Sequence, residues 1–191
     1  MKDSFLRKLF KRIPELEGER VLLRRLRVAD AADMYDYARR ESVTRYLLWS
    51  PHPDPDYTRQ YLSYLQGRYR DGELYDWAVI DKTSWKMIGT TGFPLISEAN
   101  RNAEVGYVLH PDYWGRGYAT EILHTVLRFA FQTLRLHRVE ARCFEEHAAS
   151  RRVMEKCNMR YEGSARDALL VKGRYVTVAV YAVLADEFAA R

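Results

Sequence analysis

HPDYWGRGYATE, residues 110–121, places two glycines one residue apart, between an apolar segment and a strongly periodic one. The first N–H groups of a helix have no intrahelical acceptor, and together with the helix dipole they attract anions. Gly115 and Gly117 let an oxygen approach these groups without meeting a Cβ, and Arg116 adds positive charge at the rim. The stretch therefore predicts a phosphate site, although a Gly-x-Gly pair alone is also compatible with an ordinary turn.

The residues around this stretch predict a strand, a helix and a second strand. Residues 102–110 alternate as a strand does, and residues 138–144 form another short apolar run. Between them, apolar residues recur at steps of three and four and share one helix face: Ala119, Ile122, Leu123, Val126, Leu127, Ala130 and Leu134. Strands joined by such a crossover are parallel, so segments 102–110 and 138–144 are expected to be parallel.

The segments before this unit predict a strand, two helices and a hairpin. Residues 19–26 predict the strand, and Asp30 is a candidate N-cap for the helix that follows. Three prolines within residues 50–56 predict a loop, and the second helix comes directly after it. Residues 74–81 and 86–96 predict two antiparallel strands joined by a short turn.

The segments after this unit predict one more helix and a terminal hairpin. Residues 146–158 predict the helix, with Asn158 as its left-handed stop. Residues 168–184 predict the hairpin, which turns at Lys172 and Gly173. The order of elements predicts a mixed α/β (α+β) domain with about seven strands and about four helices. Residues 1–17 are expected to form an N-terminal arm or short helix, and residues 18–191 the domain.

Composition excludes several classes of protein. The 191 residues are 47% apolar and 30% charged, as in a soluble globular domain, and no run is long enough to cross a membrane. The basic N-terminus lacks the apolar core of a signal peptide. Cys143 and Cys157 and the five histidines lack metal-ligand spacing, so we expect no metal, reduced cysteines and a cytoplasmic location. The net charge of +5 favours an anionic partner, but without a nucleic-acid motif we expect no direct nucleic-acid binding.

Several motifs together resemble the GCN5-related N-acetyltransferase (GNAT) superfamily. The glycine register Trp114-Gly115-Arg116-Gly117-Tyr118-Ala119 is similar to its acetyl-CoA signature, with Trp114 where Gln or Arg is more usual. That substitution, and the stretches 19–47, 104–113 and 165–188, resemble the ribosomal-protein N-terminal (Rim-type) branch. The resemblance covers residues 18–188 and implies a partly splayed sheet with acetyl-CoA bound in a V-shaped cleft.

The resemblance also implies residues for the cofactor. The pyrophosphate is expected to meet the amides of Gly115, Arg116, Gly117, Tyr118 and Ala119, with Trp114 and Thr120 beside them. The pantetheine is expected to pair with backbone at Tyr107, Val108 and Leu109 like an added strand. An amide near Val108 or Leu109 is expected to polarise the thioester carbonyl. His147 stands where the family has an asparagine that contacts pantetheine, and it is otherwise a solvated or capping residue.

Catalytic roles are expected at two positions. Direct transfer to an amine needs a proton acceptor and correct positioning rather than a covalent enzyme nucleophile. Glu104 is the expected base, with an exposed carboxylate at a strand end as the alternative. The tyrosine acid of many superfamily members is replaced by Met154. Ser150 is therefore expected to hydrogen-bond or protonate the CoA sulfur, unless it is only a helix-packing residue.

The acceptor is expected to be a protein or peptide N-terminal amine. Tyr46 and Trp49 lie where the family builds its acceptor pocket, although core packing also explains them. Acetylation of a small amine such as a polyamine, amino sugar or antibiotic is a second hypothesis. A non-catalytic acyl-CoA-binding module and a basic RNA-associated protein are further ones. The protein is expected to be a monomer or homodimer.

Overall fold

The central sheet has the strand order β1-β2-β3-β4-β5-β6-β8-β7. The computed structural model in which it is seen describes residues 5–189. The strands are β1 (Leu16–Glu17), β2 (Val21–Arg24), β3 (Asp76–Asp81), β4 (Met87–Ser97), β5 (Asn102–Leu109), β6 (Arg138–Phe144), β7 (Arg160–Val171) and β8 (Arg174–Leu184). Neighbours are antiparallel except β5 and β6, which are parallel as predicted. The mixed α/β architecture is confirmed. The sheet has eight strands where about seven were expected, because β1 is only two residues long and too short to give a sequence pattern.

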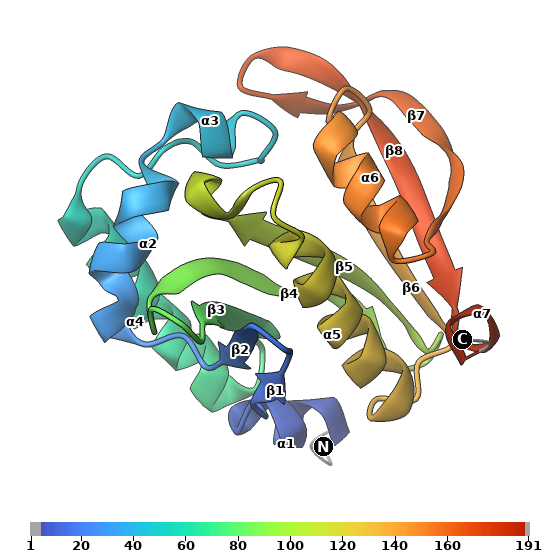
Figure 1. The fold of residues 1–191 in the computed structure, drawn as a ribbon, viewed down its shortest axis with the longest axis horizontal. Helices are drawn as coiled ribbons and strands as arrows, with labels where there is room; N and C mark the ends of the chain where they lie inside the picture. Colours follow the sequence, from blue (N-terminus) through green and yellow to red (C-terminus); the bar gives the residue numbers. More distant parts are fainter. Residues whose placement is uncertain (1–4, 190–191) are drawn as a thin grey trace.

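Helices cover both faces of this sheet (Figure 1). The helices are α1 (Phe5–Lys11), α2 (Ala31–Ala38), α3 (Glu41–Thr44), α4 (Pro55–Asp71), α5 (Tyr118–Gln132), α6 (Ala148–Lys156) and α7 (Ala185–Ala189), with 3-10 turns η1 (Val28–Asp30) and η2 (Pro111–Tyr113). The four expected helices are α2, α4, α5 and α6. Helix α1 is the short helix that was one of the two expectations for residues 1–17. The short helices α3 and α7 were missed because four or five residues give too little periodicity to detect.

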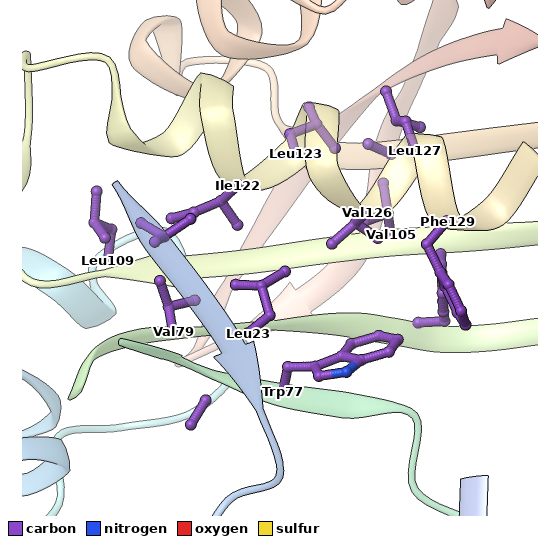
Figure 2. Packing of buried hydrophobic residues seen from close by; sticks show 14 of the residues in the cluster. Leu23, Trp77, Val79, Val105, Leu109, Ile122, Leu123, Val126, Leu127 and Phe129 are labelled. Atoms are coloured by element: carbon purple, nitrogen blue, oxygen red, sulfur yellow. The ribbon is translucent and has the colours of Figure 1, made fainter. Parts of the chain in front are cut away.

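The core between the sheet and α5 carries most of the buried apolar side chains (Figure 2). Ile122, Leu123, Val126 and Leu127 are buried on the helix face that their spacing predicts. They face side chains of β2, β3 and β5, and Trp77 of β3 packs edge-on against Phe129 of α5 with ring centroids 5.6 Å apart. This packing holds α5 against the middle of the sheet, so its N-terminus lies beside the end of β5.

Helices α2 and α4 cover the opposite face. The Asp54 carboxylate accepts a hydrogen bond from the Tyr57 amide (2.7 Å) and caps the N-terminus of α4, and Gly72 ends this helix with a φ of 67°. The Tyr69 hydroxyl of α4 donates to the carbonyl oxygen of Asp76 at 2.5 Å and ties the helix to the start of β3.

The start of the chain packs into the core between the sheet and α5. Phe10 of α1 is fully buried and packs edge-on against Trp77, with ring centroids 5.6 Å apart. Strand β1 pairs with β2, so the described part of segment 1–17 contributes to both the core and the sheet. The parts of the expected arm and domain at residues 1–4 and 190–191 lie outside the described residues. No helix within residues 5–189 has the length and apolar character needed to cross a membrane.

Two local predictions are confirmed, and a third needs correction. Asn158 ends α6 with a φ of 62°, and the terminal hairpin turns at Lys172 and Gly173. Asp30 occupies the N-cap position of α2, but its carboxylate accepts no hydrogen bond from the amides of α2; it accepts one from the Arg27 amide at the start of η1 (2.8 Å). It pairs instead with the Arg24 guanidinium (2.6 Å), because that cation is a stronger partner for a buried carboxylate than a helix amide.

Candidate active site

The glycine turn lies between the end of β5 and the start of α5. Gly115 and Gly117 have φ angles of 70° and 82°, in the left-handed region that favours glycine. The Glu121 amide donates to the Gly117 carbonyl (3.1 Å), which leaves the amides of residues 118–120 without an acceptor inside the helix. A Cβ at Gly115 would meet no atom within 4 Å, so an anion can reach this turn freely.

Two arginines place positive charge around the turn. The Arg20 guanidinium lies 4.2 Å from the centre of the Tyr118 ring, donates to the carbonyl oxygen of Arg116 (2.9 Å) and pairs with Glu121 (2.8 Å). The Arg116 guanidinium lies 5.6 Å from the Tyr113 ring. Arg116 was expected here from the sequence. Arg20 was not, because it is distant in the chain and reaches the turn only through the packing of β2.

Two aromatic residues of the glycine register hold the turn in place. The Trp114 indole donates to the carbonyl oxygen of Leu109 (2.7 Å), and the Tyr118 hydroxyl donates to Asp81 on β3 (3.0 Å). Ala119 and Thr120 occupy the first turn of α5, and the Thr120 carbonyl accepts from the Cys157 thiol (3.4 Å). These contacts fix the helix start relative to two strands.

Strands β5 and β6 separate beyond a short paired segment. They pair only between residues 102–104 and 138–140. Beyond this point β5 stays paired with β4 up to Leu109, and β6 stays paired with β8 up to Phe144. The halves of the sheet therefore part in a V that opens toward the glycine turn, as the resemblance implied.

The register of β5 decides which backbone groups face this opening. The His110 amide donates to the carbonyl of Ile88 on β4 (2.7 Å). Because hydrogen-bonding direction alternates along an antiparallel strand, Val108 also turns its polar backbone toward β4. Tyr107 and Leu109 turn their backbone N–H and C=O groups toward the opening. Of the two amides expected to polarise the thioester carbonyl, those of Val108 and Leu109, only that of Leu109 therefore faces the opening.

A cavity of about 310 Å³ lies in the opening and passes from one face of the sheet to the other. Trp77, Thr91 and Tyr107 are direct partners across β3, β4 and β5, so they share the face that α5 covers. The next row, made of Asp76, Gly92 and Gly106, therefore faces α4. Lining side chains come from both faces: Tyr107, Ser150 and Met154 on one, and Trp49, Tyr61 and Asp76 on the other.

Two hydroxyl groups meet inside the cavity on the α6 side. The Tyr107 hydroxyl lies 2.9 Å from Ser150 Oγ, and burial raises the pKa of this tyrosine above its ordinary value. Cys143 of β6 also lines the cavity, and burial raises the pKa of its thiol to about 11. Ser150 was expected from the sequence, whereas Tyr107 was expected only for its backbone. Its position opposite Ser150 depends on the angle between α6 and β5.

Two carboxylates lie at the apex of the V. Glu104 and Glu140 are direct partners across the parallel pair, and each side chain is 20% exposed. Arg142 Nη2 lies 2.8 Å from Glu140, and its Nε lies 3.5 Å from Glu104. Burial raises the pKa of Glu104, and Arg142 partly offsets this rise. Glu104 is not among the residues that line the cavity and lies beside it. Its neighbour Glu140 was not predicted as a site residue, because it belongs to no recognisable sequence motif.

The predicted acceptor residues are found at the cavity, close to His147. Tyr46 and Trp49 both line it, and the Tyr46 ring stacks on the His147 imidazole with centroids 4.3 Å apart. His147 occupies the N-cap position of α6 without a side-chain capping bond, and burial lowers its pKa, which favours the neutral ring. The described residues include no group of three or more acidic, histidine or cysteine side chains placed to hold a metal ion.

Comparison with known proteins shows which family this chain resembles. A family model described as an acetyltransferase (GNAT) domain matches residues 20–160. The uncharacterised N-acetyltransferase p20 of Bacillus licheniformis is 30% identical over 174 residues, which cover 91% of this chain and 98% of that protein. The [ribosomal protein uS5]-alanine N-acetyltransferase of Escherichia coli is 24% identical over 168 residues, covering 84% of this chain and 85% of that protein.

A solved structure has the same fold. The GCN5-related N-acetyltransferase from Brucella melitensis superposes with a TM-score of 0.83 at 27% identity, covering 93% of this chain and 81% of that one. The similarity therefore extends over the sheet, the glycine turn and the opening between β5 and β6.

Proposed function

Because the chain belongs to the GNAT family and is an N-acetyltransferase, we propose that it moves the acetyl group of acetyl-CoA directly to a primary amine, that of a protein or peptide N-terminus. The observation that carries this proposal is the cavity between β5 and β6, which is lined from both faces of the sheet, by Tyr107 and Ser150 on one side and by Trp49 on the other. The glycine turn follows the end of β5, outside the residues that line this cavity. Donor and acceptor can then enter from opposite faces and meet between β5 and β6.

The glycine turn fits the diphosphate of the cofactor. The open space beside Gly115, the left-handed glycines and the amides at the start of α5 form a cradle that side chains would fill. Arg116 and Arg20 add charge there. Trp114, Ala119 and Thr120 complete this part of the proposed site, and the acetyl thioester is what acetyl-CoA supplies when it is bound.

The backbone of β5 would hold the pantetheine. Tyr107 and Leu109 offer polar groups to the opening, and the Leu109 amide can donate to the thioester carbonyl oxygen. Val108 contributes its side chain to the cavity wall. Neutral His147 can accept or donate one hydrogen bond beside the pantetheine, because its ring lines the cavity without a charge to desolvate.

Proton transfer is assigned to Glu104 and Ser150. A new bond joins the amine nitrogen to the acetyl carbon while the carbon–sulfur bond breaks, so the amine loses a proton and the sulfur gains one. Glu104, directly or through water, would take the amine proton. The Ser150 hydroxyl, held by its hydrogen bond to Tyr107, would donate to the sulfur, and solvent would return a proton to Ser150 and remove the one that Glu104 has taken.

Small amines are a second candidate class of acceptor. The specific observation in their favour is the Asp76 carboxylate inside the cavity, beside the aromatic rings of Trp49 and Tyr61. Carboxylates and aromatic faces both attract cations, and the cavity volume of about 310 Å³ suits a small group. We also propose a cytoplasmic location, since Cys143 and Cys157 are free thiols.

Mass spectrometry of peptides and small amines incubated with the purified enzyme and acetyl-CoA tests the reaction. The expected product gains one acetyl group on an amine, and one free thiol is released for each. Binding of the cofactor without acetylation of any peptide or small amine would contradict the proposed transfer.

Substitution of Gly117 tests the cofactor site separately. In Gly117→Glu a side chain enters the cradle and its negative charge repels the diphosphate, so we expect calorimetry to detect no CoA binding. Gly173→Glu is the matched control, because Gly173 has a φ of 80° close to that of Gly117 and lies in the distant β7–β8 turn. A Cβ at Gly173 would meet no atom within 4 Å, and one at Gly117 would only reach Arg20 Nη2 at 3.4 Å. Equal CoA affinity in folded Gly117→Glu and in Gly173→Glu would rule out this turn as the binding site.

A further inference from the structure

Asp76 is a charged group in the cavity, and acetyl transfer to a peptide N-terminus assigns it no role. It begins β3, on the sheet face that α4 covers. Among the described residues that line the cavity, it alone carries a carboxylate. The residues already assigned to proton transfer come from β5 and α6, so the carboxylate of Asp76 needs a separate explanation.

Two glycines keep a path open between Asp76 and the reaction site. Asp76, Gly92 and Gly106 are direct partners across β3, β4 and β5. A Cβ at Gly92 would lie only 1.9 Å from Asp76 Oδ1, so the carboxylate lies directly over the backbone of β4. Gly92 and Gly106 add no side chain between this carboxylate and the opening, and the Pro94 ring, 3.5 Å from where a Cβ of Gly106 would lie, forms an apolar wall of this path.

The Asp76 carboxylate has no cationic partner within hydrogen-bonding distance. Among the described residues, no hydrogen bond or ion pair reaches its oxygens, and Arg68 acts on it only at longer range. Burial raises the pKa of Asp76 to about 6, so most of these side chains are ionised at neutral pH. A partly buried charge without a partner is costly, and a cation entering the cavity would reduce that cost.

The distance from Asp76 to the opening determines which cation it can reach. Its carboxylate lies over β4, whereas the opening lies beyond β5. At about 4.8 Å between strands, this separation is roughly 7 Å. A nitrogen in contact with an acetyl carbon in the opening is too far away for a direct hydrogen bond. A second nitrogen on the same acceptor can lie over Gly92 and Gly106, where it can reach the Asp76 carboxylate.

We infer that Asp76 binds a second positively charged nitrogen of the acceptor, remote from the nitrogen that is acetylated. The inference rests on the proposed acetyl transfer and concerns its second candidate class of acceptor, the small amines, among which it favours compounds with two cationic nitrogens. Trp49 and Tyr61 line the same end of the cavity and present aromatic surface to the cation. A linear diamine of moderate length fits this arrangement, since its charged ends are separated by apolar methylene groups.

Direct binding provides the first test. Calorimetry with 1,4-diaminobutane and with butylamine is carried out on the wild type, Asp76→Asn and Asp71→Asn. Asp71 is an exposed residue at the end of α4 and serves as the matched control. We expect the diamine to bind more tightly than the monoamine to the wild type and to Asp71→Asn, and this preference to fall about 10-fold in Asp76→Asn. An equal affinity of the wild type for both amines would overturn the inference.

Kinetics with the same amines provides the second test. We expect kcat/KM for the diamine to fall about 10-fold more than kcat/KM for butylamine when Asp76 becomes Asn. Asp76→Glu moves the carboxylate toward the opening, so it should shift the preference to the shorter 1,3-diaminopropane. Equal losses for both amines, or no shift in Asp76→Glu, would contradict the role of Asp76. Diamine binding without acetylation of any amine would instead overturn the proposed transfer and leave the Asp76 site intact.

Discussion

Single glycines serve this site in two physically different ways. Gly115 and Gly117 are needed for their backbone angles, because both have positive φ where the chain turns into α5. Gly92 is needed for its missing side chain, since a Cβ there would collide with the Asp76 carboxylate. The first use can be predicted from a Gly-x-Gly motif. The second cannot, because it depends on what lies on the neighbouring strand.

Glu104→Gln tests the proposed base at the residue scale. We expect kcat to fall about 100-fold with little change in CoA affinity, because a proton acceptor is lost and the cofactor site is untouched. Burial raises the pKa of Glu104, so the wild-type rate should drop as pH falls through a value above that of an ordinary glutamate. In the variant this low-pH limb should disappear from the profile of kcat/KM against pH.

Two further variants make this test selective. Glu98→Gln changes an exposed glutamate beyond the end of β4 and should keep the wild-type rate and pH profile. Glu140→Gln removes the neighbouring carboxylate that shares Arg142. If Glu140→Gln abolished the low-pH limb and Glu104→Gln retained it, the base would be Glu140.

At the scale of elements, the positions of α4, α5 and β5 determine the shape of the site. The buried face of α5 holds its N-terminus beside the end of β5, which brings the glycine turn to the opening. Helix α4 carries Tyr61 to the opposite end of the cavity. The acceptor end therefore depends on how firmly α4 is held at its start.

Asp54→Ala tests this dependence. The Asp54 carboxylate caps α4 by accepting from the Tyr57 amide, and loss of such a cap costs about 1 kcal/mol of unfolding free energy. We expect urea unfolding to report a loss of this size. Asp71→Ala at the other end of α4 should show none, because a carboxylate near a helix C-terminus is not stabilising. Equal stabilities of Asp54→Ala and the wild type would mean that packing alone holds the helix start.

At the scale of the whole molecule, the site exists because one sheet is divided into two halves. Strands β1 to β5 and strands β6 to β8 are joined by only three paired residues on each side of the parallel contact. The halves are held together by helices as well as by this contact, since α5 and α6 pack against each other and bridge the opening (Figure 1). A cavity can therefore cross the sheet without dividing the hydrophobic core.

The Asp76 carboxylate should destabilise the fold at neutral pH. Burial raises its pKa from an ordinary 3.8 to about 6, so the folded protein binds the proton more tightly than the unfolded chain does. The stability from this proton is present below pH 4 and is lost as pH rises toward 6 and above. At about 1.36 kcal/mol per pKa unit, the upper bound on this loss is about 3 kcal/mol.

Denaturant unfolding of the wild type and Asp76→Asn at pH 4 and pH 7.5 measures this effect. We expect the variant to gain stability relative to the wild type between the two pH values, by up to about 3 kcal/mol. Asp71→Asn should show no such gain. A difference between wild type and Asp76→Asn that does not change with pH would mean that this carboxylate titrates normally.

The sequence predicted the regular elements and the cofactor turn because those signals are local. The face of α5, the parallel pair of strands and the stop at Asn158 follow from periodicity and from residues a few positions apart. The number of short elements was underestimated, since α3 and α7 are too brief to show a period. The capping role of Asp30 was wrong because Arg24, on another element, competes for its carboxylate.

By itself the sequence determined an α/β domain with a glycine turn, Gly115 and Gly117, at the start of α5. Both are consequences of hydrophobic spacing and of the backbone freedom of glycine. Only the tertiary structure brought Arg20 to that turn, the Tyr107 hydroxyl to Ser150 and the Asp76 carboxylate into the cavity. These meetings depend on strand register and on the angle between packed elements, which are set by the whole core rather than by any one segment.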